Sequence, residues 1–323
     1  MSARPKVVAL DDYEDCLRKG GDWKAVEARA DVTVHTRRLR GEVLFEAIED
    51  ADAIVVIRDR TPFKADLIAR LPKLKAFIFT GLRNTQLDFA ALAERGIPVG
   101  NTDHGSSKHS TAEMNWALIL AAAKRLEEFF VLARNGGWRD GGRLPWVLHG
   151  ERLGLVGFGE IGQLVARAGA AFGMEIVTWS PHMTPERAGA GGATSVTLEE
   201  LLATSKVVSL HLVPSAETRK LLDARRLATM RPDAILANTA RSALIDMAAL
   251  PTALDAGRPA VAALDVYDDE PLTPGHALAA RRDVVLSPHL GFVNDPVFSL
   301  YGPGVTENLL AWLDGRPLPR PAT

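Results

Sequence analysis

The feature that most constrains the fold is a glycine-rich turn between a predicted strand and a predicted helix. The apolar segment Arg152–Val156 runs directly into Gly157-Phe158-Gly159-Glu160-Ile161-Gly162, and a helical pattern follows from Gln163 to Phe172. In such a turn the first glycine permits the bend, the second lets backbone approach a pyrophosphate, and the third lets helix and strand pack closely. The free amides of the helix N-terminus attract the same anion. We therefore predict a dinucleotide site that includes Gly157, Gly159, Glu160, Ile161 and Gly162.

The next predicted strand, Glu175–Trp179, ends immediately before Ser180. An acidic residue at this position accepts a hydrogen bond from the ribose 2′-hydroxyl of NAD and repels the 2′-phosphate of NADP. Ser180 does neither, and His182 and Arg187 follow within a few residues. The cofactor is predicted to be NAD or NADP, with NADP slightly favoured.

The rest of the chain repeats this alternation of strand and helix. We predict α/β architecture with two doubly wound parallel sheets, each covered by helices on both faces. The first series has strands at Lys6–Leu10, Val32–His35, Ala53–Ile57, Lys75–Phe79 and Ile97–Asn101. A long helix is predicted from Ser110 to Arg134, with Ser110 as its N-cap and Glu113 as the capping-box partner. The second series has six strands, at Arg152–Val156, Glu175–Trp179, Val207–Leu212, Ala234–Asn238, Ala260–Val266 and Val284–Ser287.

Composition excludes several classes of protein. The net charge of −2 gives no electrostatic basis for binding nucleic acid or an anionic membrane. The longest apolar run, near Trp116–Ala123, is much shorter than a membrane span. The single cysteine, Cys16, forms no internal disulfide and no cysteine-based metal site, and no metal site of another kind is visible. We expect a cytoplasmic protein without a signal peptide.

Three later segments each follow a predicted strand and carry reactive side chains. They are Asn238-Thr239-Ala240-Arg241, Leu264-Asp265 through Glu270-Pro271, and Ser287-Pro288-His289-Leu290-Gly291. Ligands bind at the carboxyl ends of strands in open α/β sheets, so these segments are expected to meet at one edge.

With these segments the chain resembles the D-isomer-specific 2-hydroxyacid dehydrogenases, a family that includes phosphoglycerate dehydrogenases and glyoxylate/hydroxypyruvate reductases. The resemblance covers nearly the whole length. It rests on Leu155–Gly162, on Ala171-Phe172-Gly173-Met174, on His211-Leu212 with Thr218, and on the three segments above, all in the family's order.

The resemblance assigns roles that the chemistry supports. His289 is implied as the general acid and base that exchanges a proton with the C2 oxygen. Glu270 is implied as its carboxylate partner, and Arg241 as the clamp for the substrate carboxylate. Asp265 matches the residue that meets the nicotinamide carboxamide, and Thr239 and Ala240 are further cofactor residues. Formate dehydrogenases of this family carry glutamine in place of Glu270, which argues against formate as the substrate.

A weaker signal lies in the first domain, in Thr80-Gly81-Leu82-Arg83-Asn84. The matching family loop binds the substrate carboxylate through backbone amides, which implies that Leu82 and Arg83 are substrate-binding residues. The family usually has a small residue at the Arg83 position, and Phe292 replaces a second glycine after His289. The roles of Arg83, Arg58, Arg60 and Phe292 stay open, since Arg58 and Arg60 fit a solvated loop equally well.

The resemblance also implies the domain organisation. Residues 1–100 and 294–323 are expected to form a flavodoxin-like substrate domain, and residues 101–293 a Rossmann dinucleotide domain, in a homodimer. The predicted reaction moves a hydride between NAD(P)H and C2 of a small 2-oxo acid or D-2-hydroxy acid. The alternative is a dinucleotide-sensing, corepressor-like binding protein without turnover. The side chain on C2, the choice between the cofactors and the physiological direction are not fixed by the sequence.

Overall fold

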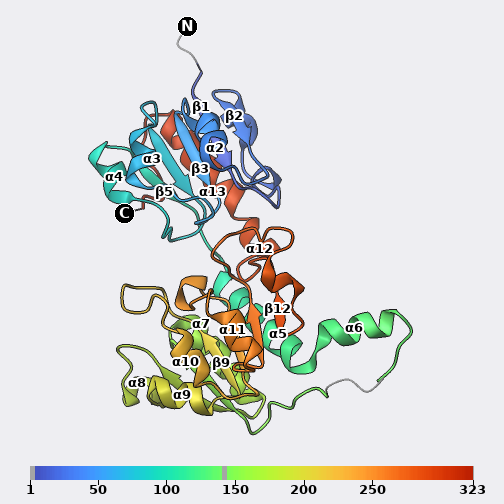
Figure 1. Cartoon of the computed structure of the whole chain (residues 1–323). Helices are drawn as coiled ribbons and strands as arrows, with labels where there is room; N and C mark the ends of the chain where they lie inside the picture. The colour runs from blue at the N-terminus through green and yellow to red at the C-terminus, as the bar shows by residue number, and fades with distance from the viewer. Residues whose placement is uncertain (1–3, 140–143, 323) are drawn as a thin grey trace. The chain divides into compact units, whose positions relative to one another are not determined.

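The computed structural model describes residues 4–139 and 144–322, and the chain divides into two compact units. The first unit comprises Met1–Ser106 and Asn294–Thr323, coloured blue to cyan and red in Figure 1. The second unit comprises Ser107–Val293 and is coloured green to orange. The chain therefore leaves the first unit once and returns to it for the final segment.

The first unit is built on a parallel five-stranded sheet with the strand order β2-β1-β3-β4-β5. This is the 2-1-3-4-5 order of flavodoxin-like folds. Its central strands β1, β3 and β4 are almost continuously apolar and buried, as expected for strands covered on both faces. Its strands are β1 (Lys6–Leu10), β2 (Asp31–Val34), β3 (Ala53–Val56), β4 (Ala76–Phe79) and β5 (Val99–Asn101).

Short helices surround this sheet, and the chain's last segment returns to its edge. The long C-terminal helix packs on β4 and β5, and the tail after it pairs with β5 through Asn101 N to Arg320 O (2.9 Å) and Ala322 N to Val99 O (2.8 Å). The helices are α1 (Trp23–Glu27), α2 (Gly41–Ile48), α3 (Ala65–Ala69), α4 (Phe89–Glu94), α12 (Asp295–Phe298) and α13 (Tyr301–Leu313), with a 3-10 turn at Leu17–Lys19.

The second unit is built on a parallel seven-stranded sheet with the order β12-β11-β10-β9-β6-β7-β8. From β8 to β11 this is the 3-2-1-4-5-6 order of the Rossmann fold, so the predicted fold class is confirmed for both units. The strands are β6 (Arg152–Val156), β7 (Glu175–Trp179), β8 (Thr194–Ser195), β9 (Val207–Leu210), β10 (Ile235–Asn238), β11 (Val261–Leu264) and β12 (Val284–Leu286).

Apolar side chains alternate between two cores, one on each face of this sheet. In β10, Leu236 joins one core, whereas Ile235 and Ala237 join the other. The helices of this unit are α5 (Ser107–Lys124), α6 (Leu126–Arg134), α7 (Glu160–Ala171), α8 (Pro185–Ala190), α9 (Leu198–Thr204), α10 (Ala224–Ala228) and α11 (Leu250–Asp255). Two 3-10 turns lie at Ser242–Leu244 and Ala277–Ala280.

The parallel register places the carboxyl ends of the strands in one row. Val156 pairs with both Leu210 and Trp179, and Asn238 pairs with both Leu210 and Leu264. The residues that follow these strands therefore share a single edge of the sheet. They are Gly157, Ser180, His211, Thr239 and Asp265.

The predicted long helix from Ser110 to Arg134 was wrong. It is two helices, α5 and α6, separated by Arg125 in a left-handed conformation (φ 55°). A continuous helix would use the Ala123 carbonyl for residue 127, but that carbonyl accepts the backbone N–H of Trp146 (2.8 Å) from the returning chain. The predicted cap was also wrong, because α5 begins at Ser107 and already contains Ser110.

Two smaller expectations about the second unit also needed correction. Its sheet has seven strands rather than six, because the two-residue strand β8 pairs with β7. Helix α7 begins at Glu160 rather than Gln163, which places Glu160, Ile161 and Gly162 in its first turn.

No helix in the described part of the chain combines the length and apolar character needed to cross a membrane.

Candidate active site

The glycine turn joins β6 to α7, and its three glycines differ in what surrounds them. A Cβ on Gly157 would lie 2.7 Å from the carbonyl carbon of His211, and a Cβ on Gly162 would lie 2.6 Å from the Gly157 oxygen. A Cβ on Gly159 would meet nothing within 4 Å. Gly157 and Gly162 are therefore required by packing, whereas Gly159 leaves open space in front of the backbone.

The same turn leaves hydrogen-bond donors available. Gly159 is the N-cap of α7 and no side chain caps this helix, so the amides of its first turn are not occupied by a capping group. Open space beside unfilled amides and the positive end of a helix fits a pyrophosphate. The five residues predicted to bind the dinucleotide all lie in this turn and the first turn of α7, which we call the phosphate cradle.

Ser180 follows β7 at the same edge and borders a hollow of about 610 Å³. Beside it, the Arg187 guanidinium folds back and donates to the His182 carbonyl (2.7 Å). The predicted ribose position therefore carries a hydroxyl, that of Ser180, rather than a carboxylate. The hollow is lined by Trp179, Ser180, Pro181, Met183 and Ser195–Glu200, so two glutamates, Glu199 and Glu200, also border it.

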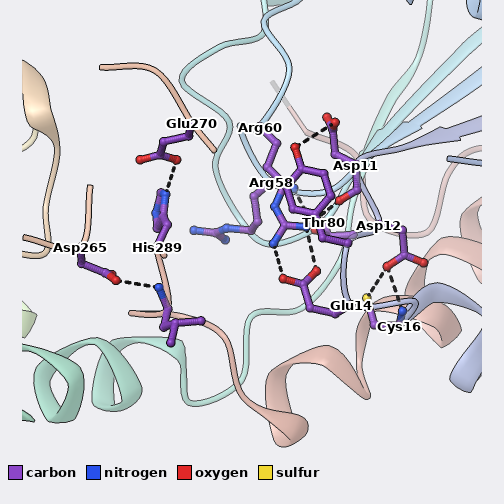
Figure 2. Close-up of polar contacts among 12 residues, drawn as sticks. Asp11, Asp12, Glu14, Cys16, Arg58, Arg60, Thr80, Asp265, Glu270 and His289 are labelled. Carbon is purple, nitrogen blue, oxygen red and sulfur yellow. Dashed lines mark hydrogen bonds and ion pairs between the residues drawn. The ribbon is translucent and has the colours of Figure 1, made fainter. Parts of the chain in front are cut away.

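His289 and Glu270, which were predicted to lie together, form a direct pair (Figure 2). The Nδ1 atom of His289 lies 2.7 Å from Glu270 Oε2. The other carboxylate oxygen of Glu270 accepts the backbone N–H of Tyr267 (2.9 Å), so both oxygens are held. The Phe292 ring contacts the His289 ring edge-to-face, with centroids 5.6 Å apart and an interplanar angle of 89°. The imidazole is therefore fixed in orientation, with Nε2 as the nitrogen turned away from Glu270.

Asp265 has a structural role that sequence reasoning missed. Its buried carboxylate accepts the Ser287 hydroxyl (2.5 Å) and the backbone N–H groups of Leu290 (2.7 Å) and Gly291 (2.8 Å). Burial raises the pKa of Asp265, and these hydrogen bonds oppose that shift. Asp265 thus ties the end of β11 to the loop that carries His289. The only sequence signal for this role was the serine at the start of that loop.

Arg241 follows β10, where Asn238 shapes the backbone. The Asn238 side chain accepts from the Ala240 N–H (3.0 Å) and donates to the Arg241 carbonyl (2.9 Å). The Arg241 guanidinium donates to the Ala240 carbonyl (2.7 Å). Asn115 of α5 also reaches this strand end, donating to the Thr239 hydroxyl (3.2 Å). No sequence pattern had singled out Asn115, because its partners are more than ninety positions away.

The remaining predicted residues belong to the first unit. Leu82 and Arg83 are exposed on the loop after β4. The Arg58 side chain lies against that loop. A Cβ on Gly81 would lie only 1.9 Å from the Nη1 atom of Arg58. Gly81 has a positive φ of 83°, a conformation that favours glycine at this position.

Arg60 is part of the framework of the first unit, so the solvated-loop interpretation of this residue was wrong. It makes two hydrogen bonds to the Glu14 carboxylate (2.7 and 2.8 Å) and one to the Asp11 carbonyl (2.6 Å), as drawn in Figure 2. Its guanidinium also lies over the Tyr13 ring, 4.4 Å from the centroid. These contacts fasten the loop after β3 to the loop after β1.

A Rossmann sheet with an open phosphate cradle at its central strand, and a histidine–carboxylate pair at the same edge, is the arrangement of a dinucleotide-dependent oxidoreductase. Comparison with known proteins also indicates a dinucleotide-dependent oxidoreductase. The family model for the "D-isomer specific 2-hydroxyacid dehydrogenase, NAD binding domain" matches residues 116–291. The chain belongs to the D-isomer-specific 2-hydroxyacid dehydrogenase family, and its second unit is a domain that binds a nicotinamide dinucleotide.

Similar proteins include reductases and dehydrogenases of this family. The glyoxylate reductase of Aeropyrum pernix is 38% identical over 283 residues, covering 85% of this chain and 84% of that protein. The D-3-phosphoglycerate dehydrogenase of Mycobacterium bovis is 36% identical over 85% of this chain, which spans only 52% of that longer protein. A crystal structure titled as a putative D-3-phosphoglycerate dehydrogenase from Ralstonia solanacearum has a TM-score of 0.86 and 33% identity, covering 97% of this chain and 96% of that one.

Proposed function

We propose that the protein reduces a small 2-oxo acid to the D-2-hydroxy acid with NAD(P)H, and catalyses the reverse reaction. The observation that carries this proposal is the His289–Glu270 pair, held at 2.7 Å with the second Glu270 oxygen fixed by Tyr267. The pair occupies the same sheet edge as the phosphate cradle, where a substrate and a dinucleotide would meet.

A bound nicotinamide would supply the hydride to C2 in reduction or accept it from C2 in oxidation. The Nδ1–H group of His289 donates to the Glu270 carboxylate, so Nε2 is the atom that gives a proton to the C2 oxygen in reduction and removes it in oxidation. Arg241 binds the substrate carboxylate with its planar fork and polarises the carbonyl. One hydride and one proton together convert the C=O group to CH–OH.

The substrate is proposed to be small. The relatives named as glyoxylate reductases and D-3-phosphoglycerate dehydrogenases favour glyoxylate, hydroxypyruvate or 3-phosphohydroxypyruvate as first candidates. We assign substrate binding to the first unit as well, through Leu82 and Arg83 on the exposed loop after β4. Phe292, packed on His289, limits the room beside the imidazole.

We propose NADPH as the somewhat preferred cofactor. Ser180 presents no carboxylate that would repel a 2′-phosphate. Arg187, which donates to the His182 carbonyl, supplies a positive charge close to Ser180 in the sequence. Glu199 and Glu200 on the border of the hollow oppose this preference, which keeps the expected difference small. Thr239, Ala240 and Asp265 are assigned to the nicotinamide end of the same cofactor.

We propose that the protein works as a homodimer in the cytoplasm. Figure 1 shows α6 extending away from the sheet of the second unit. Helix α6 buries none of its residues, and Phe130 and Val131 on it are 56% and 60% exposed. A second copy of the chain would cover this apolar face. Sedimentation of the wild type against Phe130→Glu tests the dimer: a monomeric wild type contradicts it.

A dinucleotide sensor without turnover is the second candidate. The named relatives are reductases and dehydrogenases, which favours the enzyme. Oxidation of NADH and NADPH at 340 nm distinguishes the two functions, with glyoxylate, hydroxypyruvate, phenylpyruvate, 2-oxoisocaproate and 3-phosphohydroxypyruvate as the panel. Turnover with any of these acids supports the enzyme. Tight dinucleotide binding without turnover across the panel contradicts it and supports the sensor.

A further inference from the structure

The phosphate cradle contains one charged side chain, and that side chain is acidic. Residues 157–163 include Glu160 and no lysine, arginine or histidine. Glu160 is the first residue of α7, and its side chain is 72% exposed. A carboxylate at a helix N-terminus stabilises the helix. The same carboxylate repels a second anion, so the cradle opposes the binding of a pyrophosphate unless a cation lies beside it.

Helix α5 supplies such a cation. The Lys108 ammonium forms an ion pair with the Glu160 carboxylate, although the two residues are 52 positions apart in the sequence. Lys108 is in the first turn of α5, and its side chain is 38% exposed. An ammonium group has three N–H donors, so the contact with one carboxylate oxygen does not use all of them. Lys108 therefore lies next to the cradle and is able to bind a second anion.

The packing of α5 on α7 places Lys108 at the ligand-binding edge of the sheet. The indole N–H of Trp116 in α5 donates to the Val165 carbonyl of α7 (3.1 Å), and the Trp116 side chain is buried. Trp116 follows Lys108 along α5 and Val165 follows Glu160 along α7, so the two helices run in the same direction. Since α7 begins directly after the glycine turn, the first turn of α5 lies at that edge as well.

We propose that Lys108 is a pyrophosphate-binding residue, and that Glu160 is an internal anion which competes with the dinucleotide for it. Without a dinucleotide, Glu160 holds the ammonium beside the cradle. The pyrophosphate of a dinucleotide is doubly negative, so it attracts the ammonium more strongly than a single carboxylate does. The competition makes binding weaker than Lys108 alone would give, which favours rapid release of the dinucleotide. The inference rests on the proposed function only for its dinucleotide, not for the reaction with 2-oxo acids.

Dinucleotide binding in the absence of any 2-oxo acid tests this proposal. Dissociation constants for NADH and ADP-ribose are measured by calorimetry on the wild type, Lys108→Met and Glu160→Gln, at ionic strengths of about 0.01 M and about 0.15 M. At the lower ionic strength, Lys108→Met should weaken the binding of both ligands by about 3- to 5-fold. Glu160→Gln should tighten it by about 2- to 5-fold, because the competing anion is removed. Both differences should shrink at the higher ionic strength.

The opposite signs distinguish competition from a purely structural ion pair. A pair that only fastened α5 to α7 would be lost equally in the two variants, so both would bind the dinucleotide less tightly or neither would change. Urea unfolding without ligand provides the separate measure of that structural role. The two variants should show similar and small losses of stability, since both side chains are exposed.

Two more variants and a third ligand serve as controls. Arg167→Met removes a positive charge from the exposed side of α7, about 10 Å along the helix from Glu160, and should leave NADH affinity within about 2-fold of the wild type. Lys108→Arg keeps the charge and should also stay within about 2-fold. Adenosine has the same base and a ribose but no phosphate, so its affinity should be the same for every variant.

Several results would overturn the proposal. The first two are an unchanged affinity for NADH and ADP-ribose in Lys108→Met, and a weakened affinity in Glu160→Gln. A loss in Arg167→Met as large as in Lys108→Met would indicate a general effect of net charge, and an equal loss for adenosine would indicate an altered site. A wild type that binds NADH but reduces no 2-oxo acid contradicts the proposed function and leaves this inference to the binding series.

Discussion

Replacing His289 by asparagine separates proton transfer from the integrity of the site. His289 has a φ of 55°, in the left-handed region that most L-residues avoid. Asparagine is among the few residues that adopt this conformation readily, so His289→Asn changes the side chain without adding backbone strain. His289→Ala would add such strain and confuse the interpretation.

The size of the effect follows from what the imidazole contacts. The substitution removes the bond to Glu270 and the edge-to-face contact with Phe292. Glu270 keeps its bond to Tyr267, and its side chain is 32% exposed, so water replaces the lost partner. The stability cost should therefore be only about 1 kcal/mol. Loss of the acid and base should lower kcat by about 10²–10⁴-fold, equivalent to about 3–5 kcal/mol of activation free energy.

The assay is steady-state oxidation of NADH or NADPH at 340 nm with the best acid of the panel, together with the dinucleotide dissociation constant. His276→Asn is a matched control, because His276 caps a 3-10 turn in the same unit and asparagine is an equally suitable cap. It should leave kcat unchanged. A His289→Asn protein with wild-type kcat would refute the assignment. A loss of dinucleotide affinity as large as the loss of kcat would show that His289 holds the site together instead.

Three further predictions address binding and stability. Arg241→Lys should raise the KM for the 2-oxo acid by about 10-fold or more and leave dinucleotide affinity intact, because a point charge does not replace a planar fork; an unchanged KM would move the clamp elsewhere. Ser180→Asp should shift the kcat/KM ratio toward NADH by at least about 10-fold through repulsion of the 2′-phosphate, and an unaltered ratio would mean that position 180 does not face the ribose. Hydrogen bonds from Arg231 and Lys206 lower the pKa of Asp233 to about 2, so its ionised form stabilises the fold above about pH 4 and this stability is lost as the pH falls toward 2. Urea unfolding at pH 2–5 should show about 1 kcal/mol less acid destabilisation in Asp233→Asn, a figure reduced for the 42% exposure of the Asp233 side chain, and parallel pH profiles would contradict it.

The sequence predicted the strands well where burial imposes a continuous apolar run. All eleven expected strands overlap strands of the structure, as the buried segments β3, β4 and β10 illustrate. The break at Arg125 was not predictable, because its cause is the Trp146 backbone returning to the Ala123 carbonyl. Helical periodicity continues across that point, and only a tertiary contact decides that the helix ends there.

The candidate site shows the same division between local signals and distant contacts. His289 and Glu270 were expected to meet because each follows a strand of one parallel sheet, and they do. The work of Asp265 in holding the His289 loop depends on backbone amides, which every residue has and no motif distinguishes. Asn115 looked like one more residue of a helix and gained its role only from facing Ser209 and Thr239.

The hydrogen bonds of Asp265 limit what a substitution at this position can show about cofactor binding. Each of its oxygens already accepts a backbone N–H from the loop that carries His289. In Asp265→Asn one oxygen becomes an NH₂ group that faces such an N–H, so the loop must shift whether or not the carboxamide ever contacts this residue. A loss of activity would then report on the position of His289 as much as on the cofactor. Thr239 has no such second duty among the described residues, since its one bond is to Asn115. The proposed contact with the nicotinamide is therefore better tested by substitution of Thr239 than of Asp265.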